Sequence, residues 1–277
     1  MSRRVIIRVL VLVSFLSAVG FGAWKAYDYA QTLINRERCY VTRVDGSDPL
    51  TLTAEQSRNA AIIVAASYKA GLPEQAAVIA LATAWQESGL RNLDYGDRDS
   101  LGLFQQRPSY DWGTPDEIMD PWYASGRFYE ELVKFDNWET RGITEMAQKV
   151  QRSGYPEAYR KHEANAIALA GALRGSRPAT LACIDRTDSP GDANAFAEVV
   201  AQVPGVESTQ DGNTVTLTSP DDAALWSAVQ LALANTRDGG IVGAEMPGHK
   251  WKQGSNHWSE AAGKGTADTA VISLREP

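Results

Sequence analysis

The strongest hydropathy signal in the chain is an apolar run over residues 5–24, interrupted by a single charge at Arg8. As a helix, this run of 20 residues would be about 30 Å long, which matches the hydrocarbon core of a membrane. Arginines precede the run, which predicts a cytoplasmic N-terminus. We therefore expect a transmembrane anchor over residues 1–26 and a stalk over residues 27–48, with the bulk of the chain outside the cytoplasm at the cell membrane. A cleaved signal peptide is the alternative interpretation.

Apolar residues recur at helical spacing over residues 49–184. Thr53 and Gln56 form a capping box that begins the first helix. A second helix follows Pro73 and is apolar almost all round, which predicts a buried central helix ending near Glu87. This segment is expected to be a mainly α domain. Its further elements are helices over about 121–133, 144–152 and 156–175, and a short strand over 101–105.

The pattern changes after residue 184, where helical faces alternate with short runs rich in β-formers. Asp211-Gly212 between two such runs predicts a hairpin. We expect a small α+β domain over residues 185–277, in the order helix-strand-strand-helix-strand-strand. The predicted fold is therefore a mainly α domain after an N-terminal transmembrane helix, followed by a small C-terminal α+β domain.

Charge narrows the possible partners. The 277 residues carry a formal charge of −7, yet the first 43 contain seven basic and two acidic side chains, so the remainder carries −12. Proteins that bind nucleic acid rely on Lys and Arg contacts to phosphate. An acidic folded part therefore argues against a nucleic-acid partner.

Cysteine and histidine usage points to a disulfide and away from a metal. Cys39 and Cys183 are the two cysteines of the chain and can pair in an oxidising compartment, where they would close the two ends of the central region. Two separate buried thiols are the alternative. The three histidines are far apart in the sequence, and there is no Cys-x-x-Cys pattern. We expect no metal and no other cofactor.

Glu87 is the candidate for acid–base chemistry, because it ends the buried apolar helix within Trp-Gln-Glu-Ser-Gly. A carboxylate at a helix C-terminus meets the negative end of the helix dipole, and partial burial disfavours its charged form. Both effects favour a retained proton, which a general acid for glycosidic cleavage requires. The alternative is an exposed glutamate at a frayed helix end.

A second motif follows the segment that contains Glu87. Glu-Ser-Gly at residues 87–89 is followed by a polar loop, by Ser-Leu-Gly-Leu-Phe-Gln at residues 100–105, and by Pro108. This double motif resembles the signature of the lysozyme-like superfamily, in particular goose-type lysozymes and soluble lytic transglycosylases. The loop after it looks like a membrane-anchored branch found in high-GC Gram-positive bacteria. The resemblance covers roughly residues 53–175.

The resemblance implies a mostly helical fold with a cleft, Glu87 as catalytic acid/base, and β-1,4-linked MurNAc–GlcNAc strands of peptidoglycan as substrate. It also implies a reaction that uses the substrate's own 6-hydroxyl and acetamido groups, without a second carboxylate. Transglycosylases usually carry a later Ala-Tyr-Asn-Ala-Gly motif, which is absent here. The nearest stretch is residues 150–156, where Tyr155 could supply a substitute ring and hydroxyl.

The substrate-binding candidates are amide, hydroxyl and aromatic side chains near the double motif. The amides could bind N-acetyl groups and the rings could pack on sugar faces, whereas core packing and solvated strand edges are the alternatives. Trp112 and Trp122 are further rings of this kind, and the aspartates at 94, 97 and 99 are expected to be solvated turn residues. The predicted binding residues are Ser100, Gln105, Gln106, Tyr110 and Tyr155.

The leading hypothesis is a membrane-anchored enzyme that cleaves cell-wall glycan, as a lytic transglycosylase or a lysozyme-like muramidase with Glu87 as general acid/base. Its partners would be peptidoglycan strands and the membrane. The second hypothesis is a non-catalytic envelope protein that binds peptidoglycan or a protein partner through a degenerate cleft. A third is an inhibitor or assembly factor in which the helical domain is only a scaffold.

Overall fold

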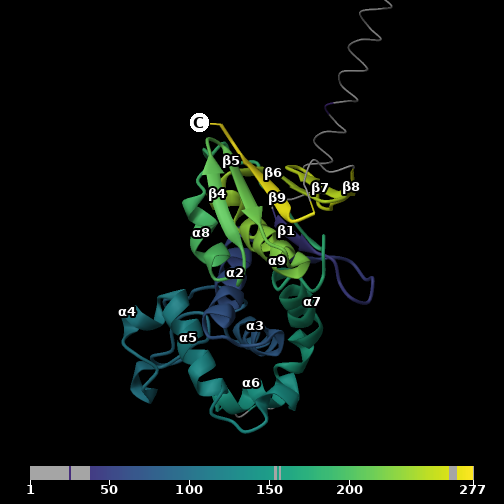
Figure 1. Cartoon of the computed structure of the whole chain (residues 1–277). Coiled ribbons are helices and arrows are strands. Elements are labelled where there is room, and N and C mark those ends of the chain that lie inside the picture. Colours follow the sequence, from purple (N-terminus) through teal and green to yellow (C-terminus); the bar gives the residue numbers. More distant parts are fainter. Residues whose placement is uncertain (1–24, 26–37, 153–154, 156, 262–266, 277) are drawn as a thin grey trace, which may run out of the picture. The chain divides into compact units, whose positions relative to one another are not determined.

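The computed structural model describes residue 25, residues 38–152, residue 155, and residues 157–261 and 267–276 (Figure 1). Within these residues, no helix is both long enough and apolar enough to cross a membrane. The longest described helix, α2 (Ala54–Lys69), has 16 residues and would reach only about 24 Å. The prediction of a single-pass protein of the cell membrane with a cytoplasmic N-terminus is corrected on this finding. The apolar run that prompted it, residues 5–24, lies outside the described residues.

The described residues form a mixed α and β fold with two antiparallel sheets, so the predicted class of a mainly α domain plus a small α+β domain is wrong. The first sheet has the strand order β2 (Leu50–Leu52), β1 (Arg38–Val41), β3 (Leu181–Ile184). It joins the two ends of the helical region, and β1 lies in the segment predicted as a stalk. These strands have three or four residues, which is too short for a period-two alternation to identify a strand, and β3 is buried at every position.

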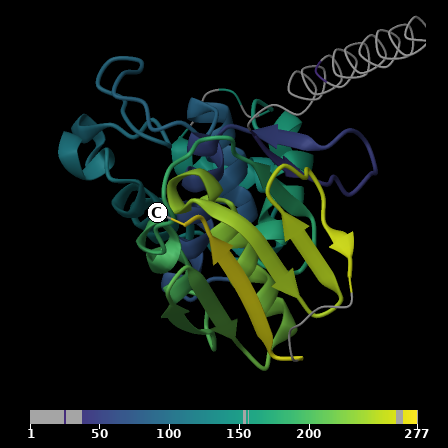
Figure 2. The ribbon, with the colours of Figure 1, turned by 90° about the horizontal axis from the view of Figure 1, so that it is seen from above.

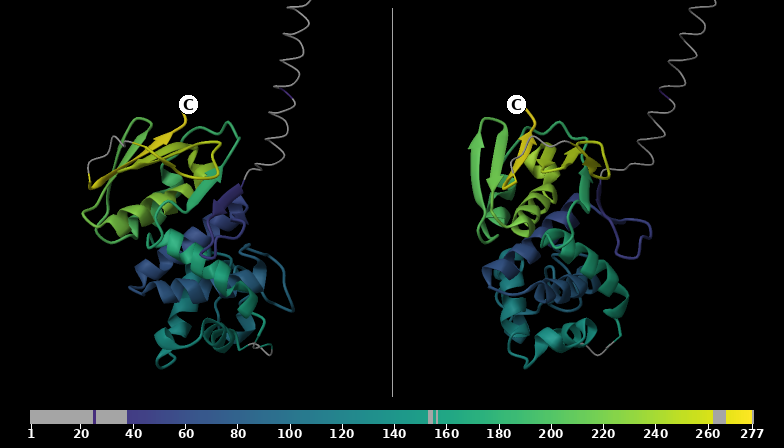
Figure 3. Two further views of the ribbon diagram at one scale, coloured as in Figure 1. Left: turned by 90° about the vertical axis from the view of Figure 1, so that its right-hand side faces the viewer. Right: turned by 45° about the vertical axis from the view of Figure 1, so that its right-hand side comes forward.

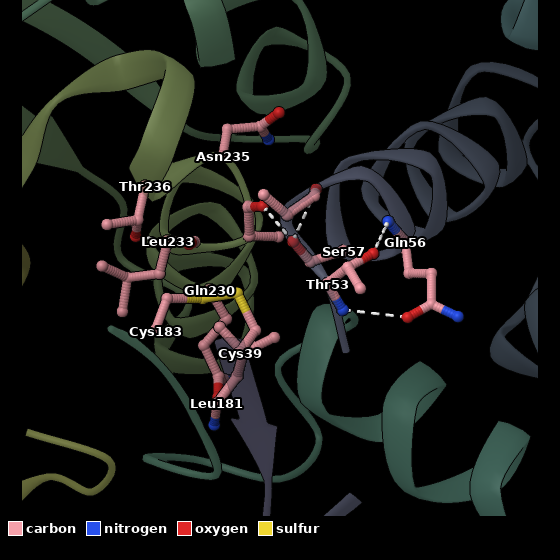
Figure 4. The surroundings of a disulfide bond; sticks show 12 residues. Cys39, Thr53, Gln56, Ser57, Leu181, Cys183, Gln230, Leu233, Asn235 and Thr236 are labelled. Carbon is pink, nitrogen blue, oxygen red and sulfur yellow. Dashed lines mark hydrogen bonds between the residues drawn. A yellow bond between two sulfur atoms is a disulfide. The ribbon is translucent and has the colours of Figure 1, made fainter. Parts of the chain in front are cut away.

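Cys39 and Cys183 form a disulfide across this sheet, which confirms the predicted pairing. The two residues are direct partners in the register of β1 and β3. Both are buried, and Figure 4 shows the bridge beside the N-terminal end of α2, near Thr53 and Ser57. The predicted capping box is also present there, because the Thr53 hydroxyl accepts from the Gln56 amide and the Gln56 side chain accepts from the Thr53 amide.

The helical region surrounds α3 (Glu74–Ser88), which contacts four of the other helices, α2, α5, α6 and α7. Its almost continuous burial agrees with the apolar pattern on all its faces. The predicted helix over 156–175 is shorter, because a 3₁₀ turn precedes it. The other elements are η1 (Pro108–Tyr110), α4 (Pro115–Ile118), α5 (Pro121–Leu132), η2 (Trp138–Thr140), α6 (Ile143–Gln151), η3 (Arg160–His162) and α7 (Glu163–Leu173).

The segment over 101–105, predicted as a strand, is instead a tight turn with isolated bridges between Leu93 and Gly102 and between Leu101 and Gln106. Gly102 has φ 76° and Gln105 has φ 49°, so both lie in the left-handed region and interrupt an extended chain. A side chain at Gly102 would stand 2.6 Å from the Ile118 carbonyl oxygen, so glycine is required there.

The second sheet has six antiparallel strands, which Figure 2 shows side by side. The predicted hairpin is confirmed, because Asp211 pairs with Thr214 across a two-residue turn. The sheet has two strands more than predicted, since the polar stretch after residue 248 forms a further hairpin. The strand order is β4 (Glu207–Asp211), β5 (Thr214–Thr218), β9 (Thr269–Leu274), β6 (Ile241–Met246), β7 (His249–Lys252), β8 (Ser259–Glu260).

Helix α9 (Asp222–Leu233) lies along one face of this sheet and also contacts α7 and β3 (Figure 3). Two short helices, α8 (Asn194–Ala201) and α10 (Thr236–Gly239), pack beside it. The fully buried Gln230 of α9 donates to Ala172 O and accepts from the Leu181 amide. Contacts group Glu37–Pro277 as one compact unit, in which α7 contacts α9 and α2 contacts α8. The domain boundary at residue 184 stays a prediction.

Candidate active site

A cleft of about 430 Å³ opens beside the C-terminal end of α3. It brings together all six residues predicted to act in catalysis or substrate binding, although they are spread over nearly 70 positions of the chain. Amide, hydroxyl and aromatic groups dominate its surface, which suits the polar edges and apolar faces of sugar rings. The lining residues are Glu87, Asp97, Ser100, Gln105, Gln106, Arg107, Tyr110, Trp112, Gln151, Arg152 and Tyr155.

Glu87 sits in the last turn of α3, where the chain leaves the helix through Gly89 in the left-handed conformation. Its carboxyl group is half-buried and accepts a 2.7 Å hydrogen bond from the Tyr159 hydroxyl. Burial is the main cause that raises the pKa of Glu87 above its ordinary value, while hydrogen bonds from Tyr159 and Gln151 lower that pKa in part. The net direction is the one expected from the sequence, and it favours a proton retained at the rim of the cleft.

Tyr159 is the residue that sequence reasoning missed. Tyr155, which the sequence suggested as the substitute ring and hydroxyl, is 78% exposed at the mouth of the cleft. Tyr159 is 1% exposed and is hydrogen-bonded to Glu87. Tyr159 immediately precedes η3, which packs against α3. In the sequence, Tyr159 stands out only as a second tyrosine four residues after Tyr155. Pro156 interrupts the helical pattern there, so the sequence does not show which way the Tyr159 side chain points.

Ser88 explains why the two halves of the motif occur together. Its hydroxyl oxygen lies 2.7 Å from Leu103 O and 3.0 Å from Ala84 O, and its single proton is shared between these two carbonyl oxygens. The Gln151 side chain donates to Phe104 O at 2.6 Å. The Leu-Phe pair is thus held between the end of α3 and the end of α6, and this arrangement fixes the turn that forms one wall of the cleft.

The two neighbouring amides have different environments. Gln105 is half-buried, and its side-chain nitrogen lies 3.3 Å from the carbonyl oxygens of Tyr95 and Gly102. Gln106 is 2% exposed, donates to Ala124 O, and has a buried side-chain oxygen with no hydrogen-bond partner in the part of the chain that the structure describes. Gln105 is therefore the better placed of the two to meet an N-acetyl group, and a direct role for Gln106 in binding stays a prediction.

Ser100 and Tyr110 contribute to the cleft through Arg107. The buried Ser100 hydroxyl accepts from Arg107 Nε at 2.9 Å, and Asp97 forms an ion pair with the same guanidinium at 2.7 Å. The guanidinium carbon lies 5.6 Å from the centre of the exposed Tyr110 ring. Tyr110 can pack on a sugar face from this position, whereas Ser100 acts mainly by fixing Arg107.

The remaining candidates divide between the cleft and its surroundings. Trp112 lines the cleft with Arg127 stacked over it, whereas Trp122 lies beneath Lys69 and does not line the cleft. Hydrogen bonds from the Ser109 side chain and from the Ser109 amide lower the pKa of the Asp99 carboxyl group, so Asp99 is a turn-stabilising residue. Among the described residues, no group of three or more His, Cys, Asp or Glu side chains could hold a metal ion.

Gly96 packs against the turn that forms one wall of the cleft, and replacing Gly96 with alanine is expected to disrupt this turn. An added Cβ would stand 2.0 Å from the Gln105 side-chain oxygen and 2.6 Å from Ser100 O, a backbone atom that cannot move cheaply. We expect a loss of about 1–3 kcal/mol in the free energy of unfolding, measured in urea. Gly126→Ala is the control, because a Cβ in this part of α5 meets nothing within 4 Å and is expected to stabilise the helix by about 1 kcal/mol.

No protein-family model matches the sequence, and no curated protein matches it either. The lysozyme-like resemblance of the double motif therefore stays a prediction, and the cleft is the feature of the molecule that bears on its function.

Proposed function

We propose that this protein cleaves the β-1,4-linked glycan strands of peptidoglycan, with Glu87 as the general acid/base. The observation that carries the proposal is a carboxyl group with a raised pKa at the rim of a cleft lined by amides, hydroxyls and aromatic rings. A general acid works best when its pKa lies near the working pH, and burial moves that of a carboxyl group in this direction.

In this mechanism, Glu87 gives its proton to the glycosidic oxygen as the bond from that oxygen to C1 breaks. The leaving sugar departs with a free 4-hydroxyl, and the acetamido group of the muramyl sugar shares the positive charge at C1. Glu87, now a carboxylate, takes a proton from the nucleophile that attacks C1. The Tyr159 hydrogen bond stabilises the carboxylate between the two proton transfers.

The number of carboxylates in the cleft favours the substrate's own 6-hydroxyl as the nucleophile. Glycosidases that use water or a covalent intermediate generally need a second carboxylate opposite the acid. The other acidic side chain of the cleft, Asp97, is paired with Arg107 and is 80% exposed. A single acid/base supports the intramolecular route, which closes a 1,6-anhydro ring on the muramyl sugar.

The alternative is a protein that binds peptidoglycan or an envelope partner without cleaving it. The absence of the Tyr-Asn motif favours this alternative. The hydrogen bond from Tyr159 to Glu87 supports the enzyme, because Tyr159 places a buried tyrosine hydroxyl at the carboxyl group without that motif. A purely scaffolding role has less support, since Glu87 lines an open cleft.

The test is release of soluble fragments from purified peptidoglycan, analysed by mass spectrometry. The proposal predicts fragments that end in 1,6-anhydro-muramyl sugars, whereas reducing ends would indicate hydrolysis by water. Retention on peptidoglycan without any release would overturn the enzymatic proposal in favour of the binding protein.

Tyr159→Phe is expected to shift the pH profile of this reaction. Removing the hydroxyl takes away a hydrogen bond that lowers the pKa of Glu87, so that pKa rises further. Since the acid must be protonated, activity falls as the pH rises through the pKa of Glu87, and this alkaline limb should move to higher pH. The rate should fall about tenfold, as for loss of one hydrogen bond to a charged group. Tyr155→Phe is the control and should leave the limb in place.

A further inference from the structure

Arg152 has a backbone conformation that favours glycine. It caps α6 with φ 50° and ψ 38°, in the left-handed region. Glycine is the usual residue at such a position, because a Cβ is disfavoured there. A residue kept in an unfavourable conformation at a candidate site points to a role for its side chain. The side chain of Arg152 lines the cleft that holds Glu87.

The guanidinium of Arg152 is exposed and has no ion pair or hydrogen bond with any described residue. The other arginine of the cleft, Arg107, is already held by Asp97, Ser100 and the Tyr110 ring. Counting contacts among the described residues only, Arg107 is the bound cation of the cleft and Arg152 the unbound one, although the whole chain carries a net charge of −7.

The acidic groups of the cleft do not balance Arg152. Asp97 is paired with Arg107, and Glu87 is the proton donor of the proposed reaction, in which it enters uncharged. A free guanidinium beside a sugar-binding surface is suited to a carboxylate, with which it can form two parallel hydrogen bonds. A neutral polysaccharide would leave it without a partner.

We propose that Arg152 binds a carboxylate carried by the glycan, so that the cleft selects muramyl strands over neutral polymers of N-acetylglucosamine. This inference rests on the proposed function, because it assigns the substrate class of the same cleft. Two sources supply the carboxylate. In strands stripped of peptide it is the free lactyl group of the muramyl sugar, and in intact strands it belongs to the stem peptide.

The experiment compares Arg152→Gly with Arg98→Gly. Arg98 is a matched control, because it is also exposed and left-handed, with φ 57°, but does not line the cleft. Each protein is given three polymers: glycan strands with stem peptides, strands stripped of peptide, and oligomers of N-acetylglucosamine. Cleavage is measured as fragment release, and binding as co-sedimentation or fluorescence polarisation.

Arg152→Gly is expected to lower cleavage and binding of a carboxylate-bearing glycan about tenfold, with no effect on neutral oligomers, while Arg98→Gly leaves all three unchanged. A loss on stripped strands assigns the lactyl group, and a loss confined to intact strands assigns the peptide. The midpoint of urea unfolding of Arg152→Gly should be equal or higher, because glycine suits this backbone.

An equal loss on neutral oligomers, or no loss on either carboxylate-bearing glycan, would overturn the assignment of Arg152. If the wild-type protein cleaves none of the polymers, the proposed catalytic function fails, and the binding measurements still decide whether Arg152 recognises the carboxylate. The two failures are therefore distinguishable.

Discussion

Replacing Glu87 with glutamine is expected to lower glycan cleavage by about 10²–10⁴-fold, the usual contribution of a general acid. Glutamine has nearly the same shape and can still accept the hydrogen bond from Tyr159, but it has no proton to donate to the glycosidic oxygen. Binding to peptidoglycan should remain close to that of the wild type. The measurement is the rate of fragment release at saturating peptidoglycan, with co-sedimentation on the same preparation.

The stability of this variant gives an independent readout. A carboxyl group whose pKa is raised by folding stabilises the folded protein while it is protonated, and this contribution is lost as the pH rises through the raised pKa. Glu87→Gln should therefore be at least as stable as the wild type above neutral pH. Gln75→Glu, on an outer part of α3, controls for a charge change on the same helix. Full activity of Glu87→Gln would remove Glu87 from the mechanism.

Loss of the disulfide is expected to have the largest effect on stability. Cys39 and Cys183 are 144 residues apart, and a bridge over a loop of this length stabilises a protein by about 5 kcal/mol in the chain-entropy model. Since whole domains are stable by only about 5–15 kcal/mol, its removal would take away a large part of the total. The measurement is urea unfolding of Cys39→Ser/Cys183→Ser, compared with the wild type with and without a reducing agent.

The effect on activity should be separate from the effect on stability. The residues that line the cleft lie between positions 87 and 155, and neither cysteine is among them. Protein that remains folded at low temperature without the bridge should therefore cleave glycan at the wild-type rate. A stability change below about 1 kcal/mol would mean that the pairing of β1 with β3 holds the chain ends together by itself.

The features that could be predicted from the sequence are those that depend on interactions between residues close together in the chain. The capping box at Thr53, the burial of α3 and the turn at Asp211-Gly212 all depend on neighbours in the same element. Glu87 can be identified for the same reason, because its place at the end of an apolar helix is a local property. The residues that contact its carboxyl group can be identified only in part.

The errors have three separate causes, and the first is contact between distant segments. The sheet of β1, β2 and β3 has strands too short to show a pattern, and its pairing joins residues near 40 with residues near 183. The membrane prediction depended on the apolarity of one segment that the structure does not describe. In the turn after Ser100, left-handed residues replaced the expected strand.

The sequence by itself determined the local chemistry: one carboxyl group at the end of a buried helix, and a following turn rich in amides and aromatic rings. The tertiary structure decided which groups meet that carboxyl group, because Tyr159 is 72 positions away from Glu87 and becomes its partner only when η3 packs on α3. It also decided that Gln106 is buried while its neighbour Gln105 is only half-buried, although both line the cleft. Periodicity reports which face of an element is apolar, whereas the partner of a polar group depends on how separate elements pack together.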